Sequence, residues 1–235
     1  MTASPPPTTS GLRAPSAQGA NAALVSLFRS VLAARWGVRA ARSIGYGVAG
    51  WLAITAWLAA KGPDADGITT GVATTGAAVL VGYAGSVVAL SLAGVPKARE
   101  VETGAWALAS TRGFSARART VAELVASIRL AAEAIALPAW ALALACALLS
   151  YEKDGAALLP IFGAALFALL ASGVIGAVAF ACRQWASARP RTSLLAAVLF
   201  PWIAGNALFQ HRGGEYASIP GFLAWSFRLL TGDSG

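Results

Sequence analysis

Charged side chains are scarce in this sequence of 235 residues. Only 12% of the residues are Asp, Glu, Lys or Arg, whereas 57% are hydrophobic. A soluble globular chain usually has about 25% charged and about 45–50% apolar residues. The scarcity excludes a soluble enzyme, a disordered protein and a DNA-binding domain, because a nucleic-acid binder gathers its basic residues on an otherwise polar surface. The composition instead indicates a chain whose solvent is largely lipid.

Residues that commonly carry chemistry are also few. His211 is the single histidine, and no HExxH, GxSxG or Walker A motif occurs. The two cysteines, Cys146 and Cys182, form no metal-ligand pattern, and we expect them to be small packing residues. The sequence therefore predicts no catalytic, cofactor-binding or metal-binding residue, and we expect that the chain is not an enzyme and does not bind ATP by a P-loop of its own.

Long apolar stretches predict an all-α, polytopic integral membrane protein built as a helical bundle. A helix needs about 20 residues to cross a bilayer, and five stretches fit as full spans. Residues 218–231 are apolar but too few to cross, so we expect a short C-terminal interfacial or re-entrant helix there, with six spans as the alternative. The five predicted spans cover residues 44–60, 67–94, 130–150, 156–181 and 193–209.

The residues before the first span predict two further segments. Residues 1–21 are rich in Pro, Ser, Thr and Ala and indicate a disordered tail. Residues 22–43 predict a cytoplasmic interfacial helix with a break near Gly37. This helix is either a positive-inside cluster beside the membrane or a surface that touches a partner protein. Residues 44–235 then form the transmembrane helical domain, with a cytoplasmic loop at 95–121.

Basic residues are distributed unevenly between the two sides of the predicted bundle. The net charge of +8 divides into +10 on the side of the N-terminus, from fourteen basic and four acidic residues, and −2 on the other side, from four basic and six acidic residues. Cytoplasmic loops of membrane proteins carry the excess of Lys and Arg. We therefore expect a multi-pass membrane protein with a cytoplasmic N-terminus and no nucleic-acid partner. Ala and Gly are abundant and Arg far outnumbers Lys, which fits a GC-rich bacterial genome and predicts the bacterial cytoplasmic (inner) membrane.

Small residues at regular spacing predict where the spans pack together, because helices in lipid associate by close backbone approach. The second predicted span offers Gly82, and the fourth offers small residues at intervals of four, which are Ala164, Ala168, Ser172 and Gly176. The only acid inside a proposed span is Glu133, which we expect to pair with Arg129 or to reach the interface. The lack of a midplane acid disfavours an ion-coupled transporter.

The loop between the second and third predicted spans is the most informative segment. Its roughly 30 residues exceed what a connection requires, and it contains a run compatible with a helix, in which Trp106 is exposed unless a partner covers it. The plain alternative is an ordinary positive-inside loop. The residues predicted to couple to a partner are Arg99, Glu100, Glu102, Gly104 and Trp106.

This loop resembles the cytoplasmic coupling region of ABC-2-type transporter permeases. That region often has a cluster of acidic and basic residues, a glycine, and an apolar helix that ends in a Leu-x-x-Thr-Pro turn. Residues 99–104 correspond to its start and residues 108–111 to its end, while Arg112 stands where the family commonly has proline. An interfacial helix and two spans precede the loop in both, and the resemblance covers residues 22–209.

The resemblance implies a permease subunit of a bacterial ABC-type export complex with a separate ATP-binding subunit. It implies that Glu100 and Glu102 pair with basic residues of that ATPase and that Trp106 is an aromatic anchor. It also implies a homo- or heterodimer of permeases in the lipid bilayer. The alternatives are a non-transporting membrane scaffold or assembly protein and, less favoured, a passive channel.

Overall fold

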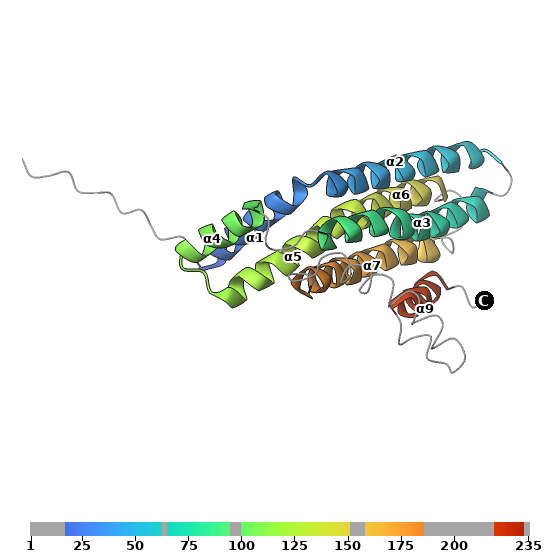
Figure 1. Cartoon of the computed structure of the whole chain (residues 1–235). Helices are drawn as coiled ribbons and strands as arrows, with labels where there is room; N and C mark the ends of the chain where they lie inside the picture. The colour runs from blue at the N-terminus through green and yellow to red at the C-terminus, as the bar shows by residue number, and fades with distance from the viewer. Residues whose placement is uncertain (1–16, 63–64, 95–99, 151–157, 186–218, 233–235) are drawn as a thin grey trace, which may run out of the picture.

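The computed structural model describes residues 17–62, 65–94, 100–150, 158–185 and 219–232, and these residues form helices with no strand among them (Figure 1). The all-helical class predicted from the sequence is therefore confirmed for this part of the chain. The described helices are α1 (Ala17–Ala33), α2 (Trp36–Ala59), α3 (Ala65–Ala93), α4 (Glu100–Thr111), α5 (Ala116–Ala134), α6 (Ala136–Ser150), α7 (Leu158–Trp185) and α9 (Ile219–Thr231).

Three segments are long and apolar enough to cross a membrane, as expected of a membrane protein. They cover residues 67–93, 116–150 and 158–184 and include most of the second, third and fourth predicted spans. The first predicted span lies in α2, whose early turns carry Arg39 and Arg42. The fifth, 193–209, lies outside the described residues, so the number of five spans stays a prediction.

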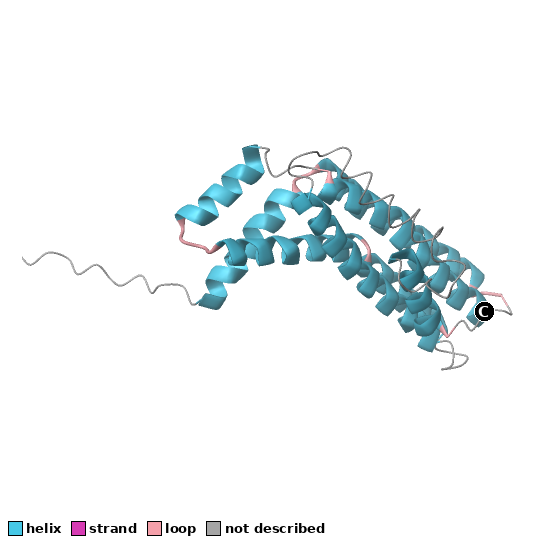
Figure 2. Cartoon of the chain, turned by 60° about the horizontal axis from the view of Figure 1, so that its bottom comes forward, coloured by secondary structure: helices cyan, strands magenta, loops and turns pink. Residues whose placement is uncertain are grey.

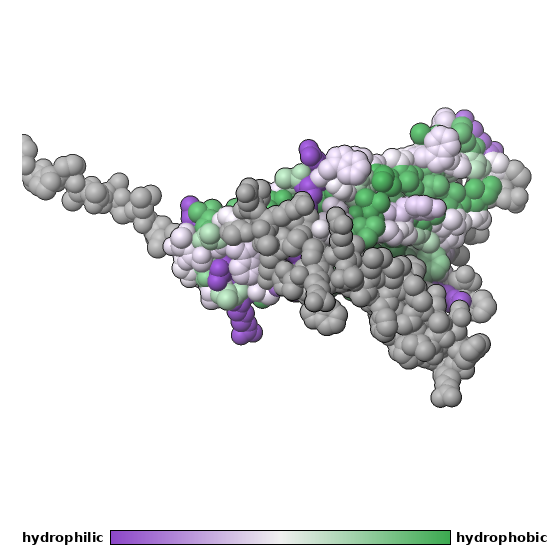
Figure 3. Space-filling view, in the orientation of Figure 1, coloured by the Kyte–Doolittle hydropathy of each residue, from purple (hydrophilic) through white to green (hydrophobic). Residues whose placement is uncertain are grey.

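The outer sides of the bundle are apolar. Trp51 on α2, Leu148 on α6 and Leu159 on α7 are 71, 70 and 78% exposed. Hydrophobic side chains gather along the middle of the bundle, and hydrophilic ones lie toward its ends (Figure 3). A water-soluble monomer rarely exposes so extended an apolar surface, which makes lipid the natural solvent for this face.

Helix α3 lies at the centre of the bundle, in contact with α2, α6 and α7. Small residues let these neighbours approach closely. A Cβ atom at Gly76 would meet the side chains of Leu52 and Leu142, and one at Gly85 would meet Ile175 at 2.8 Å. The core is consequently built largely from alanine, glycine and leucine.

The break predicted near Gly37 lies slightly earlier, at Ala34 and Arg35 between α1 and α2. The backbone of Arg35 is extended, and its side chain donates from Nη1 to the carbonyl oxygens of Ser91 at 2.9 Å and Leu92 at 3.2 Å. Those carbonyls belong to the last turn of α3, where a cation offsets the negative end of the helix dipole. The bonds to α3 therefore explain why the turn forms at Arg35.

The helix that contains the third predicted span begins at Ala116 rather than near residue 130. Ser115 caps it, since its Oγ accepts a hydrogen bond of 3.1 Å from the amide of Ala118. From there α5 and α6 run almost continuously over 35 residues to Ser150, a length of about 52 Å. The loop predicted at 95–121 thus contains α4 and the first turns of α5.

A kink joins α5 to α6 at Ile135. Pro138 has no amide hydrogen, so the carbonyl of Ala134 loses its partner within the helix. Hydrogen bonds from Ile135 to Ala131 and from Ala139 to Ile135 continue across the kink. Gly45 of α2 lies directly on the freed carbonyl, where a Cβ atom would collide with the oxygen of Ala134 and stand 3.1 Å from Pro138 Cγ. The bundle bends between its two ends (Figure 2).

The C-terminal stretch predicted as an interfacial or re-entrant helix forms α9, which packs on α7. The rings of Phe167 and Phe227 meet edge to face, with centroids 5.0 Å apart. A Cβ atom at Gly163 would overlap the carbonyl of Leu230. The close contact shows that α9 is part of the bundle, and its 13 residues span only about 20 Å.

The close approach at the kink generates a prediction. We expect Gly45→Ala to lower the free energy of unfolding by about 1–3 kcal/mol, because the added methyl group must displace backbone atoms of α5. The matched control is Gly47→Ala on the same helix, where nothing lies within 4 Å of the added atom and alanine favours the helix. Thermal unfolding in detergent compares the two, and equal melting temperatures would contradict the role of Gly45.

Candidate partner-docking surface

Helix α4 occupies the position predicted for a coupling element, between two apolar segments. One edge is buried through Ala105 and Ala109, and the adjoining edge is exposed through Gly104 and Leu108. Small buried residues on one side and exposed residues on the other are typical of a helix that packs on other helices and leaves one face accessible. The exposed edge is therefore available for contact with another molecule.

Trp106 attaches α4 to its neighbours. Its ring meets Phe28 of α1 edge to face, with centroids 5.9 Å apart, and the guanidinium of Arg119 on α5 lies 4.9 Å from the ring centroid. Arg119 Nη1 also donates to the carbonyl oxygen of Trp106 at 3.3 Å. The half-buried indole thus joins three helices, a role that its position in the predicted loop did not indicate.

The turn from α4 to α5 is built from local backbone bonds. The amide of Gly113 donates to Ser110 at 3.0 Å and that of Phe114 to Ala109 at 3.1 Å, which is the Schellman pattern at a helix end. Gly113 has φ of +78°, a conformation that glycine adopts without strain. The chain therefore turns at Gly113, one residue after the position where the ABC-2 family commonly has proline.

Three helices, α1, α4 and α5, contact one another at one end of the bundle and are here called the α1–α4–α5 unit (Figure 1). Leu24, Phe28 and Leu32 form the buried face of α1 within it. Since 35 residues of helix exceed the roughly 30 Å of a bilayer core, the first half of α5 can carry α4 beyond the membrane while its continuation crosses it.

Glu133 on α5 is the centre of an arginine cluster. Arg29 of α1 donates to Oε1 at 2.7 Å, Arg42 of α2 bonds Oε2, and Arg129 lies 3.6 Å from Oε1. The predicted pairing of Glu133 with Arg129 is present, and two arginines from other helices join it. The hydrogen bond to Glu133 and its negative charge raise the pKa of Arg29 above its ordinary value.

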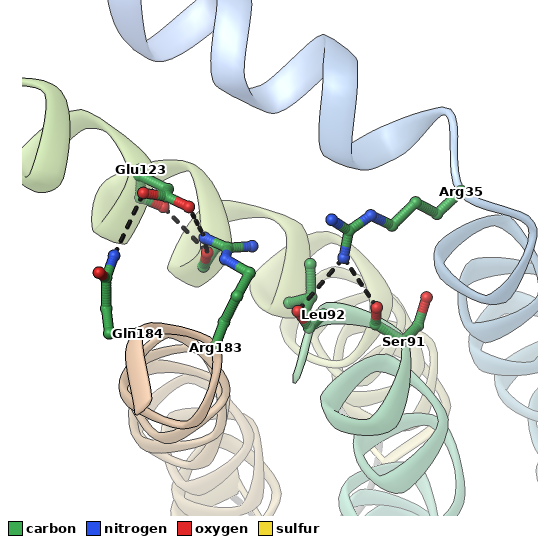
Figure 4. A network of polar contacts seen from close by, with 7 residues as sticks. Arg35, Ser91, Leu92, Glu123, Arg183 and Gln184 are labelled. Carbon is green, nitrogen blue, oxygen red and sulfur yellow. Dashed lines mark hydrogen bonds and ion pairs between the residues drawn. The ribbon is translucent and has the colours of Figure 1, made fainter. Parts of the chain in front are cut away.

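A second ion pair is fully buried, between Glu123 of α5 and Arg183 of α7 (Figure 4). Arg183 Nη2 lies 2.6 Å from Glu123 Oε1 and donates to Ser127 Oγ at 3.3 Å. Gln184 donates to the other carboxylate oxygen at 3.3 Å. The exposed fractions of the two charged side chains are 3% and 0%. The pair joins α5 to α7 beside the α1–α4–α5 unit.

Glu123 and Arg183 are among the four acidic and fourteen basic residues counted on the side of the N-terminus, and their pairing was not predicted from the sequence. A signal was present on α5, because Glu123 shares a helix face with Ser127 and Leu130, which are both buried. A carboxylate within a small and apolar face predicts a buried partner. No such spacing identifies Arg183 from its own segment, since it lies in the last turn of the apolar helix α7.

The predicted coupling residues lie at or next to the start of α4. Arg99 is outside the described residues, and Glu100 and Glu102 lie in the first turn of α4, with side chains that are also outside the description. Gly104 is exposed, with open space around it. The structure therefore brings Gly104 and the backbone of both acids onto one short helix.

The predicted packing residues occupy different environments. Ala164, Ala168 and Ser172 are buried in α7, and at Gly176 a Cβ atom would lie 2.5 Å from Ile128 Cα of α5. Gly82 is exposed on α3, with nothing within 4 Å. One stripe of α7 thus lies in the interior, whereas Gly82 faces outward.

No protein-family model, curated protein or solved structure matches this chain. Among the described residues no three His, Cys, Asp or Glu side chains gather into a possible metal site, and both cysteines are buried as free thiols.

The buried pair generates a prediction about stability. We expect Arg183→Met to lower the free energy of unfolding by about 3–5 kcal/mol, because it leaves the carboxylate of Glu123 buried without its cation. Adding Glu123→Leu to that variant should recover most of the loss, since two apolar side chains can replace a buried pair. Chemical denaturation in detergent gives the free energy of unfolding of the wild-type protein, the single variant and the double variant.

The control for this pair is Arg129→Gln. Arg129 is 63% exposed, so its loss should cost less than about 1 kcal/mol. If Arg183→Met costs no more than this control, the pair does not hold α5 against α7.

Proposed function

We propose that this chain is the membrane-spanning permease subunit of a bacterial ABC-type export complex. In this proposal it lies in the cytoplasmic membrane with the α1–α4–α5 unit in the cytoplasm, and it couples to a separate ATP-binding subunit through α4 and the adjoining loop residues 96–120. The supporting observation is the direct mechanical path from α4 through α5 into α6.

Charge supports the orientation. The described arginines Arg112, Arg117 and Arg129 lie in or beside the α1–α4–α5 unit, and Arg39 lies at the start of α2. At the opposite end the described basic side chains are Lys61 after α2 and Arg228 on α9. An excess of basic residues marks the cytoplasmic side of a membrane protein, and the N-terminal helix α1 belongs to the basic end.

Helix α4 supports the docking role. Its exposed edge is apolar at Leu108, and the sequence of its first turn contains two acids, Glu100 and Glu102, on an otherwise basic end. Trp106 and Arg119 hold α4 on α5. A push on α4 would therefore reach α5 without passing through a flexible linker.

The kink supports a mechanism for transmission. Force that reaches α5 meets Ile135 and Pro138, where one helical hydrogen bond is absent and the small Gly45 lies against the bend. Rotation there would move α6 relative to α2 and α3. Five or six helices make half of a transport path, so we propose that two permeases assemble, and ATP-driven closure of the partner subunits would move the two copies against each other.

The acids of α4 provide the test. We expect the chain to co-purify in mild detergent with an ATP-binding subunit from its native membrane, in stoichiometric yield. Glu100→Arg combined with Glu102→Arg should reduce that yield about tenfold or more, because charge reversal replaces attraction to a basic partner with repulsion. The matched control reverses Glu152 and Asp154, two acids predicted on the other side, and should retain the partner.

Three outcomes contradict the proposal. An association unchanged by the reversal at Glu100 and Glu102 excludes α4 as the docking surface. A wild-type chain that holds other membrane proteins but no ATPase is a scaffold. Solute flux through liposomes that contain the chain alone identifies a passive channel.

A further inference from the structure

The arginine cluster around Glu133 has more positive charge than its acid neutralises. Arg29, Arg42 and Arg129 come from α1, α2 and α5, and all three guanidinium groups converge on one carboxylate. Their net charge is +2. A second anion that reaches the outer side of the cluster would therefore meet an uncompensated positive charge.

The cluster is open to the outside of the bundle. The side chains of Arg29, Arg42 and Arg129 are 38, 27 and 63% exposed, whereas that of Glu133 is 15% exposed. The acid thus lies behind the arginines, which face outward. This arrangement differs from the enclosed pair of Glu123 and Arg183, where neither side chain is accessible.

Exposed apolar residues lie next to the cluster, on the side away from the α1–α4–α5 unit. Tyr46 lies one turn after Arg42 on α2 and is 50% exposed, and Leu137 lies two turns after Arg129 and is 52% exposed. The site therefore joins a cationic end to an apolar surface. A free phosphate ion would use only the first part, whereas a phospholipid has a head group for the arginines and chains for the apolar surface.

We propose that Arg29, Arg42 and Arg129 bind the phosphate of an anionic phospholipid in the leaflet next to the α1–α4–α5 unit. Guanidinium groups match phosphate oxygens in charge and in planar two-point hydrogen bonding. Basic pockets at the ends of membrane helices recognise such head groups. The bound lipid would connect α1, α2 and α5 at the level of the kink. The inference rests on the membrane placement proposed above but needs no ATPase.

The test uses the full chain alone in detergent, with equal amounts of phosphatidylglycerol and phosphatidylcholine, and counts each bound lipid by native mass spectrometry. We expect wild-type protein to retain phosphatidylglycerol preferentially. Arg129→Gln should weaken that binding about fivefold. Arg29→Gln together with Arg129→Gln brings the cluster to zero net charge and should abolish the preference. Glu133→Gln, which removes the competing anion, should strengthen it.

Arg112→Gln is the matched control, since Arg112 is an exposed arginine of the turn after α4 and should not change lipid retention. An equal loss of bound phosphatidylglycerol in the Arg112 and Arg129 variants would show a general charge effect and would overturn the proposed site. Unchanged binding of phosphatidylglycerol in both variants would also overturn it. Displacement of the lipid by inorganic phosphate at equal concentration would identify a soluble-anion site instead. Because no ATPase is present, failure here is separate from failure of partner docking.

Discussion

Helix α5 is approached by two other helix backbones within a stretch of seven residues. Gly176 brings α7 against Ile128, and Gly45 brings α2 against Ala134. Apolar side chains gain little by leaving lipid for the interior of a protein, so helices in a membrane depend on close packing to associate. A single methyl group at either glycine would separate the backbones. These two contacts fix α5 against α2 and α7, while α3 packs on α2, α6 and α7 at the centre of the bundle.

The ion pairs between helices also involve α5. Glu123 and Glu133 both lie on α5, and each bonds arginines from other helices, Arg183 from α7 in the first case and Arg29 and Arg42 in the second. The two acids differ in access. Breaking the enclosed pair of Glu123 and Arg183 would cost much stability, so this pair fixes α5 to α7. The exposed cluster around Glu133 keeps a net positive charge and is suited to binding an anion.

The sequence was sufficient to predict the helical class and the approximate position of the long apolar segments, because span length and hydropathy depend on local composition. It was less informative about contacts between distant segments. Gly82 and Gly176 look alike in sequence, yet only Gly176 meets another helix, since α3 has small residues on more than one face. Trp106 was expected to face a partner, and its contact with Phe28 depends on how α1 folds back. No spacing within either segment reports that contact.

The proposed coupling of a partner ATPase to the permease through α4 depends on which helices at the α1–α4–α5 end of the bundle can move separately. Arg119 holds Trp106 of α4 to α5, and Arg183 holds α5 to the end of α7. These parts would move as one body, and the nearest weak point is the kink at Ile135, where Pro138 removes a hydrogen bond. The arginine cluster lies two residues before that kink and connects the moving body to α2. An anionic lipid bound there would tie α1 and α2 to α5 just before the proline, and would therefore resist movement of α5 relative to α2 at the kink.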